Sequence, residues 1–260
     1  SEALFRRFGK FVNSLAGKYI TAEDVGISPI DMTYVSMETD HVVGLPGKSG
    51  DPSPVTAHGV YVGMKASAKV QFGSDSLSGK KVAVQGVGHV GEYLVKSLAA
   101  EGAEVFITDI HEPTLKRVSD LYGAKVVGLD EIYDIDMDIY APCALGATIN
   151  DDTLSRLKCS IIAGAANNQL KVEDVHGRAV MDKGMIYAPD FALNAGGVIN
   201  CYSEVKGLSA EWAMNKSEQI YNTIENIIRR SQTESIPTYM IANKMAEERI
   251  ESISKVKLPL

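Results

Sequence analysis

Six residues in the first half of the chain have the glycine spacing of a phosphate-binding turn. This G-x-G-x-x-G motif follows an apolar run and consists of Gly86, Val87, Gly88, His89, Val90 and Gly91. In such turns the first glycine makes a tight bend, the second lets the backbone approach a pyrophosphate, and the third lets helix and strand pack closely. Unpaired N–H groups at the start of the next helix would then face the phosphates. The motif predicts dinucleotide binding, although the same glycines also fit an α/β turn that binds nothing.

An acidic residue supports the dinucleotide interpretation. The next apolar run ends in Asp109, which comes 23 residues after Gly86. At this place a carboxylate can accept hydrogen bonds from both hydroxyls of a ribose. Because its charge would repel a 2′-phosphate, Asp109 favours NAD over NADP as the cofactor. His111 could weaken this preference, or it could be an ordinary surface residue.

The elements that would position these residues alternate between strand and helix. Apolar runs rich in Val, Ile and Tyr predict strands at 82–86, 104–109, 138–142, 160–165 and 185–189, and helical spacing predicts helices at 89–100, 112–122, 151–158 and 175–183. This alternation predicts an α/β fold with a mostly parallel sheet that is covered by helices on both faces.

Two regions fall outside that alternation. The stretch 44–54 is dense in glycine and proline, so it predicts a loop or hinge. Near the other end the apolar spacing predicts one long helix, and Pro237 predicts the start of another. The apolar residues of that long helix are Trp212, Ile220, Ile224, Ile227 and Ile228. We expect an α/β domain over roughly 52–232, flanked by terminal pieces that pack together.

Composition excludes several classes of protein. The net charge of −7 argues against a nucleic-acid partner, since phosphate binding needs a clustered basic surface. No apolar run approaches the ~18 residues of a membrane span, so we expect no membrane association. Three scattered cysteines are too few for a disulfide framework or a zinc site, and no metal is expected. Without a recognisable signal peptide, a reducing cytoplasm is the predicted location.

Five further segments indicate one particular protein family. Together they resemble the glutamate/leucine/phenylalanine/valine dehydrogenase family, most of all its leucine dehydrogenase branch, over nearly the whole chain and in family order. These segments are 17–26 (GKYITAEDVG), 52–59 (PSPVTAHG), 141–146 (APCALG), 164–168 (GAANN) and 194–200 (NAGGVIN). The resemblance implies reversible NAD-dependent oxidative deamination of an L-amino acid to a 2-oxo acid and ammonia, in a homo-oligomeric full-length enzyme. It also implies a Rossmann-type NAD-binding domain at 52–232, and a second, catalytic α/β domain built from 1–51 and the returning helix 233–260.

The same resemblance implies roles on the substrate side. Asp24 matches the catalytic acid that moves protons to and from the amine, although such an aspartate also often caps a helix or turn. Ala22, Val198 and Cys201 match the positions that line the side-chain pocket. Since none could pair with a substrate carboxylate, branched aliphatic amino acids such as L-leucine are favoured over glutamate. A wider pocket of the phenylalanine dehydrogenase type is the alternative.

On the cofactor side, the resemblance implies contacts from four loops. Thr56 would bind the nicotinamide carboxamide, although it could also be a helix N-cap, and Asn194 would lie near the nicotinamide ring. Asn168 would touch the substrate. The remaining expected contacts are Pro142, Cys143, Ala144, Ala165, Ala166 and Asn167, near the ribose. No basic partner for a thiolate occurs in its motif, so Cys143 is expected to be a packing residue and not a nucleophile.

One family segment is not found in the 260 residues. The resemblance places a Gly-Gly-Gly-Lys motif and two active-site lysines before the helix that begins Glu-Ala-Leu-Phe, and Lys10, Lys18 and Lys48 do not lie in matching motifs. One lysine would bind the substrate carboxylate and the other would activate water. We therefore expect a leucine dehydrogenase whose N-terminal catalytic portion has been removed. The alternative to an active enzyme is a fragment that binds NAD without turnover.

Overall fold

The computed structural model describes residues 1–24 and 26–256. Contacts between Cα atoms divide the chain into two units. Unit 1 consists of Ser1–Thr56 and Ala195–Ser217, and unit 2 of Ala57–Asn194 and Glu218–Leu260. The chain thus passes between the units at 56/57, 194/195 and 217/218, whereas the sequence-based domain boundaries were 51/52 and 232/233.

Unit 2 is built on a parallel six-stranded sheet with the order β3-β2-β1-β4-β5-β6. The strands are β1 (Lys81–Gln85), β2 (Glu104–Thr108), β3 (Lys125–Val126), β4 (Ile139–Pro142), β5 (Ile161–Ile162) and β6 (Ile186–Tyr187). This is the doubly wound order, whose switch point lies between β1 and β4. The predicted α/β class and parallel sheet are confirmed. Strand β3 was not predicted, because it has two exposed residues and no apolar run.

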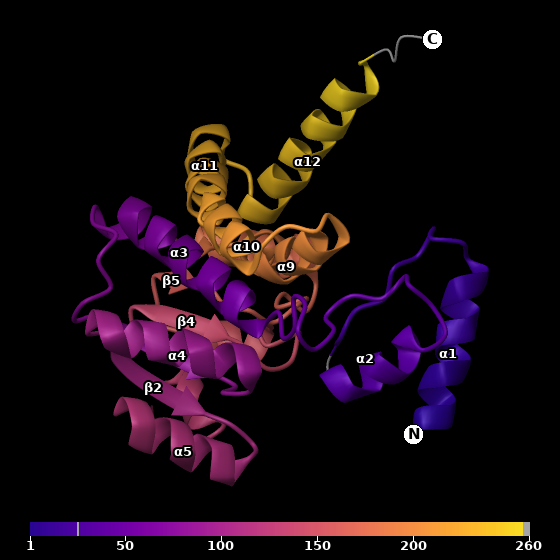
Figure 1. The fold of residues 1–260 in the computed structure, drawn as a ribbon. Helices are drawn as coiled ribbons and strands as arrows, with labels where there is room; N and C mark the ends of the chain where they lie inside the picture. Colours follow the sequence, from indigo (N-terminus) through magenta and orange to yellow (C-terminus); the bar gives the residue numbers. More distant parts are fainter. Residues whose placement is uncertain (25, 257–260) are drawn as a thin grey trace. The chain divides into compact units, whose positions relative to one another are not determined.

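Alternate residues of the strands face opposite helical layers. Ala83, Tyr140, Ile162 and Tyr187 are register partners across β1, β4, β5 and β6, and they belong to one buried cluster. The neighbouring elements on that side include α6 (Asp151–Arg156) and α7 (Glu173–Asp182), which contribute Leu154 and Val180 to the cluster. Helices α4 (His89–Glu101) and α5 (Glu112–Tyr122) contact each other and strands β1 to β3 (Figure 1). The helices predicted at 89–100, 112–122, 151–158 and 175–183 are confirmed, with small differences at their ends.

The other helices among the described residues of unit 2 are α3 (Ser53–Phe72, in this unit from Ala57), the 3-10 helix η1 (Glu131–Tyr133), α8 (Asp190–Leu193), α11 (Gln219–Glu234) and α12 (Thr238–Ser254). Gly63 lets α3 approach its neighbours, because a Cβ there would lie 2.2 Å from Cδ1 of Leu193. The helix predicted after Pro237 is confirmed as α12. The prediction of one long helix from Trp212 to Ile228 was wrong. The structure has α10 (Ala210–Ser217) and α11, and the chain passes from unit 1 to unit 2 between them.

Unit 1 contains α1 (Glu2–Ser14), α2 (Pro29–Ser36), the first residues of α3, α9 (Gly196–Val205) and α10. Met32, Val35 and Val42 form one small buried cluster in it. A reciprocal capping box between Ser28 and Asp31 starts α2. The loop predicted at 44–54 ends earlier, since the Asp51 carboxylate accepts the Ser53 N–H at 2.8 Å and α3 begins there.

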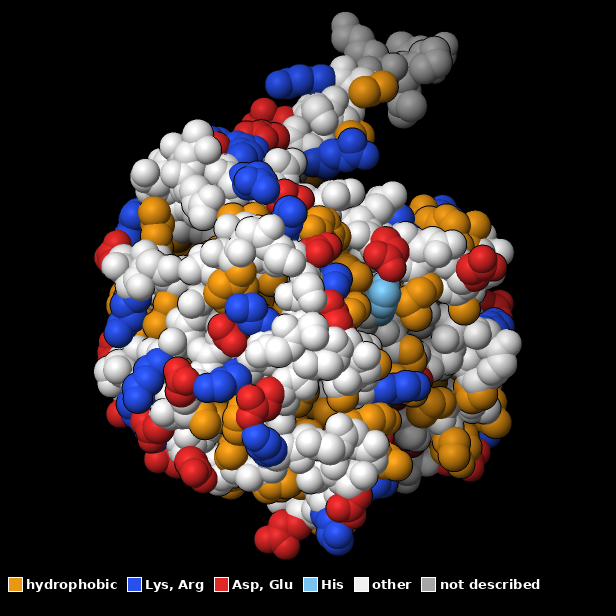
Figure 2. Space-filling model, turned by 90° about the vertical axis from the view of Figure 1, so that its left-hand side faces the viewer, with side chains coloured by type: hydrophobic (Ala, Val, Ile, Leu, Met, Phe, Trp, Pro, Cys, Tyr) orange, Lys and Arg blue, Asp and Glu red, His pale blue; other side chains and the backbone are white. Residues whose placement is uncertain are grey.

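Charged side chains of both signs are interspersed over the face drawn in Figure 2. One pair of such contacts in unit 2 joins Arg156 to Asp130 at 2.8 Å and to Asp134 at 2.7 Å. Among the described residues, no helix is both long and apolar enough to cross a lipid bilayer.

Candidate functional site

The three glycines of the G-x-G-x-x-G motif occupy different environments. Gly86 has φ +98°, and a Cβ there would lie 2.7 Å from the Cβ of Ala144. A Cβ on Gly91 would lie 2.0 Å from the carbonyl oxygen of Gly86. At Gly88 no described atom comes within 4 Å of the Cβ position. Packing therefore requires two of the glycines, while the third leaves open space at the start of α4, where helix N–H groups lack intrahelical acceptors.

The carboxylate of Asp109 lies against this turn. It follows β2, and its Oδ2 accepts a hydrogen bond from the Val87 N–H at 2.7 Å. Its Oδ1 accepts from the His111 N–H at 2.8 Å. Because a carboxylate has about four acceptor positions, both oxygens keep capacity for ribose hydroxyls. The imidazole of His111 lies 2.8 Å from the Thr114 hydroxyl at the start of α5, which supports the interpretation of His111 as an ordinary surface residue.

The loops after β4 and β5 pack on the turn and on each other. The Cys143 N–H donates to the Gln85 carbonyl at 2.7 Å, and the Ala166 N–H donates to the Pro142 carbonyl at 3.0 Å. Gly164 makes this approach possible, since a Cβ there would lie 2.2 Å from the Pro142 carbonyl oxygen. Burial raises the pKa of the Cys143 thiol to about 12, so the thiol stays protonated at neutral pH. That environment supports a packing role for Cys143.

Three asparagines lie at this edge of the sheet. The Asn194 side-chain amide donates to Asn167 Oδ1 at 2.6 Å and to the Ala165 carbonyl at 3.0 Å. Asn168 has a left-handed backbone (φ +53°), and its carbonyl accepts the Ala147 N–H at 2.7 Å. Asparagine tolerates this conformation better than most residues. The structure therefore brings together the predicted cofactor residues of unit 2 at the carboxyl ends of β1, β2, β4 and β5.

In unit 1, Thr56 lies against the start of α9. A Cβ on Gly197 would be 3.1 Å from the Thr56 hydroxyl oxygen, and a Cβ on Gly196 would be 2.2 Å from the Val55 carbonyl oxygen. The Thr56 hydroxyl donates to the Pro52 carbonyl at 3.0 Å. Since α3 begins at Ser53, Thr56 lies within its first turn and is not an N-cap.

Four of the residues predicted for the substrate side belong to unit 1, namely Ala22, Asp24, Val198 and Cys201, whereas Asn168 belongs to unit 2. Val198 and Cys201 lie on one face of α9, one turn apart, and Val198 is 75% exposed. Burial, followed by the charge of Glu204, raises the pKa of the Cys201 thiol. Ala22 is half-buried beside the Thr21–Val42 bridge. The exposed Asp24 accepts the Ile27 N–H through its main-chain carbonyl at 2.9 Å.

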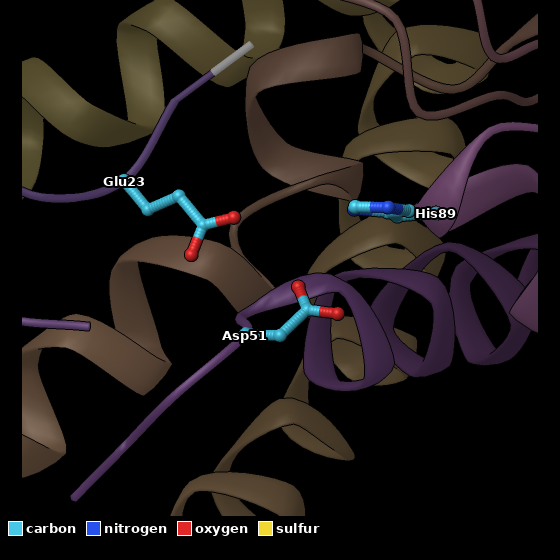
Figure 3. A group of neighbouring side chains, drawn as sticks. All are labelled: Glu23, Asp51 and His89. Carbon is cyan, nitrogen blue, oxygen red and sulfur yellow. The ribbon is translucent and has the colours of Figure 1, made fainter. Parts of the chain in front are cut away.

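Three acidic residues of unit 1 were not among the predicted site residues: Glu23, Asp51 and Glu204. In Figure 3 the carboxylates of Glu23 and Asp51 point toward each other; the figure also draws His89, the first residue of α4. An aspartate two residues before Ser53 was an available cap signal. Nothing in the local pattern of α9 distinguishes Glu204.

Comparison with known proteins places the chain in a family. The sequence profile of the glutamate/leucine/phenylalanine/valine dehydrogenases matches residues 107–256, and leucine dehydrogenase of Bacillus subtilis is 53% identical over 258 residues. The chain belongs to this family. The alignment with the Bacillus subtilis protein covers 98% of this chain and 71% of that protein. The family uses NAD(P).

Other members are similar over the same extent. L-tryptophan dehydrogenase of Nostoc punctiforme is 42% identical, covering 99% of this chain and 73% of that protein. A crystal structure of the Nostoc punctiforme enzyme matches with a TM-score of 0.85, covering 98% of this chain and 74% of that one. A hetero-hexameric glutamate dehydrogenase from Thermus thermophilus is 20% identical with a TM-score of 0.77, covers 99% of this chain and 70% of that one, and shows the shared fold alone.

Proposed function

We propose that this chain carries the cofactor-binding residues and part of the substrate-binding residues of an NAD-dependent amino-acid dehydrogenase. The reaction is reversible oxidative deamination of L-leucine and other branched-chain L-amino acids to 2-oxo acids and ammonia. One observation carries the proposal. The open space at Gly88 lies in the same turn whose Val87 N–H binds the Asp109 carboxylate.

The residues present fit NAD. At Gly88 the backbone is free of a side chain where a pyrophosphate would approach, and Asp109 keeps acceptor capacity for ribose hydroxyls. Bound NAD would supply the hydride acceptor. Thr56 and Asn194 would orient the nicotinamide, and the loops at Pro142 and Ala165 would lie against its ribose.

On the substrate side, the proposed roles are proton transfer and exclusion of charge. Asp24 would move protons at the substrate amine, and Asn168 would contact the substrate. Ala22, Val198 and Cys201 would line an aliphatic pocket in which an unpaired glutamate carboxylate would cost several kcal/mol. The identity of 53% with a leucine dehydrogenase supports this assignment.

Calorimetric titration tests the cofactor. We expect NAD to bind with a clear preference over NADP, because the negative charge of Asp109 opposes a 2′-phosphate. Equal or tighter binding of NADP would contradict the assignment.

Turnover with a series of amino acids tests the substrate. With NAD at alkaline pH, L-leucine and L-valine should exceed L-glutamate in kcat/KM by roughly 100-fold or more, because burial of an unpaired charge costs several kcal/mol. A preference for L-glutamate would contradict the pocket assignment. A preference for L-phenylalanine would instead favour the wider pocket.

A second candidate function is NAD binding without turnover. It applies to a polypeptide that consists of these 260 residues alone, which spans 71% of the length of the Bacillus subtilis leucine dehydrogenase. Residues that act as a unit lose activity steeply when one is missing. A preparation of verified mass that binds NAD but forms no NADH with excess L-leucine would support this candidate, and steady turnover would exclude it.

A further inference from the structure

We propose that Glu204 is a positioning residue that fastens the loop 44–49 to α9 and thereby holds Thr56 in place for the nicotinamide. This inference rests on the proposed function, in which Thr56 binds the carboxamide. It assigns a task to a buried carboxylate that the cofactor and substrate roles leave unexplained. The side chain of Glu204 is 7% exposed.

Glu204 collects hydrogen bonds from both ends of the loop. Its Oε2 accepts from the Gly44 N–H at 2.8 Å, from the Ser49 N–H at 3.2 Å and from the Ser49 hydroxyl. The Nζ of Lys48 lies 3.9 Å from Oε1. Hydrogen bonds to an ionised acceptor are stronger than neutral ones, and each donor left without a partner in a buried place is costly. A single carboxylate therefore closes the loop 44–49 upon the end of α9.

The loop leads directly into the first turn of α3. Asp51 caps that turn through the Ser53 N–H, and Thr56 follows within it. The first turn of α9 packs on the same residues, since Gly196 has no room for a side chain against Val55 and Thr56, and a Cβ on Gly197 would lie 3.1 Å from the Thr56 hydroxyl oxygen. The segment 44–56 is thus held to α9 by the glycine contact at one end of the helix and by Glu204 at the other, and the Asn200 side-chain amide adds a long hydrogen bond to the Ser49 carbonyl at 3.5 Å.

This arrangement predicts which ligands bind more weakly when the Glu204 carboxylate is lost. Loss of its carboxylate frees the loop and loosens the first turn of α3, while the turn at Gly86 and Asp109 keeps its own local contacts. Contacts to the nicotinamide end of NAD should weaken, and contacts to the ADP-ribose portion should remain. A general loss of stability would instead weaken the binding of both ligands alike.

The experiment compares NAD with ADP-ribose in calorimetric titrations of four proteins: the unchanged chain, Glu204→Ala, Ser49→Ala and the control Glu211→Gln, which alters an exposed glutamate on α10. We expect Glu204→Ala to lower the affinity for NAD about 10-fold, the equivalent of ~1.4 kcal/mol, without changing the affinity for ADP-ribose. Ser49→Ala removes one of the three hydrogen bonds and should have a smaller effect in the same direction. Glu211→Gln should match the unchanged chain.

Hydrogen–deuterium exchange provides a readout that does not depend on the cofactor. Amides in 44–56 should exchange faster in Glu204→Ala, and those in 86–91 should not, because local opening depends on local contacts. The proposal is overturned if 44–56 keeps its protection, or if Glu204→Ala leaves the ratio of NAD to ADP-ribose affinity unchanged. If the unchanged chain binds neither ligand, the proposed NAD function fails, while the exchange pattern still decides whether Glu204 fastens the loop.

Discussion

In each unit a glycine lies against the backbone of another residue, but the two contacts join residues that are separated very differently along the sequence. In unit 2 a Cβ on Gly91 would lie 2.0 Å from the carbonyl oxygen of Gly86, five residues earlier. In unit 1 a Cβ on Gly196 would lie 2.2 Å from the carbonyl oxygen of Val55, 141 residues earlier. The close approach is local in the first case, whereas in the second it requires distant segments to be brought together.

This difference matters for the way each region does its task. The Gly86 turn and Asp109 are linked by one short hydrogen bond within a single β–α–β stretch, so their geometry follows from a few neighbouring residues. The α9 contact depends on Glu204, the loop 44–49 and the start of α3 together. We therefore expect a substitution at the open position of the unit 2 turn, Gly88, to change binding without changing folding, and substitutions at its packed position Gly91 or at the α9 contact of unit 1 to change both.

The largest effect should come from Gly91→Ala. The added Cβ meets a backbone oxygen that cannot rotate away, so strain of ~1–3 kcal/mol or more should lower the free energy of unfolding, and NAD binding should be lost with the turn. Urea denaturation measures the first effect and calorimetry the second. Gly196→Ala should be comparably destabilising. A Gly91→Ala variant with an unchanged free energy of unfolding would contradict the view that both backbone contacts exclude a side chain.

Gly88→Ala should affect binding alone. Because the Cβ position is open and φ is −65°, the free energy of unfolding should stay within ~0.5 kcal/mol of the unchanged chain. A methyl group in the space proposed for the pyrophosphate should lower the affinity for NAD by at least ~10-fold, or ~1.4 kcal/mol. Retention of full NAD affinity would show that no phosphate approaches Gly88.

Asp109→Ser should lessen the preference for NAD over NADP. Removing the charge costs the ribose hydrogen bonds, worth ~1.5–3 kcal/mol for a charged acceptor, and relieves repulsion of a 2′-phosphate. The ratio of the two dissociation constants is the measurement. Thr56→Val is the matched comparison in unit 1, since it should weaken both cofactors and leave that ratio unchanged.

The smallest effect concerns the cysteines. Burial raises the pKa of both Cys143 and Cys159 to about 12, so at pH 8 only about 10⁻⁴ of each thiol is thiolate. Alkylation by iodoacetamide should begin at Cys201 in unit 1, where burial raises the thiol pKa less than it does at Cys143 and Cys159, and its rate should rise with pH as the thiolate fraction grows. Peptide mass spectrometry gives the order, and early modification of Cys143 would contradict its role as a packing residue.

The features that can be predicted from the order of the amino acids are those whose physical cause is local. The G-x-G-x-x-G turn was visible because each glycine's task lies within six residues, and Asp109 because a β–α–β unit has a nearly constant length. Strand and helix alternation predicted the parallel sheet for the same reason. These features depend on hydrophobic periodicity and on backbone conformations that individual residues permit.

Features that depend on partners distant along the chain could not be predicted from the sequence and are seen in the folded structure. The apolar spacing runs on from α10 to α11 without glycine or proline, yet the chain passes between units at Ser217, and the next residue, Glu218, pairs with His58 at 2.6 Å. Strand β3 forms because its backbone pairs with the neighbouring strand β2. Glu204 looks like any helix-surface acid until Gly44 and Ser49 supply its donors from more than 150 residues away. Burial and hydrogen bonding of a charge are set by what surrounds it in space, and no periodicity along the chain records that surrounding.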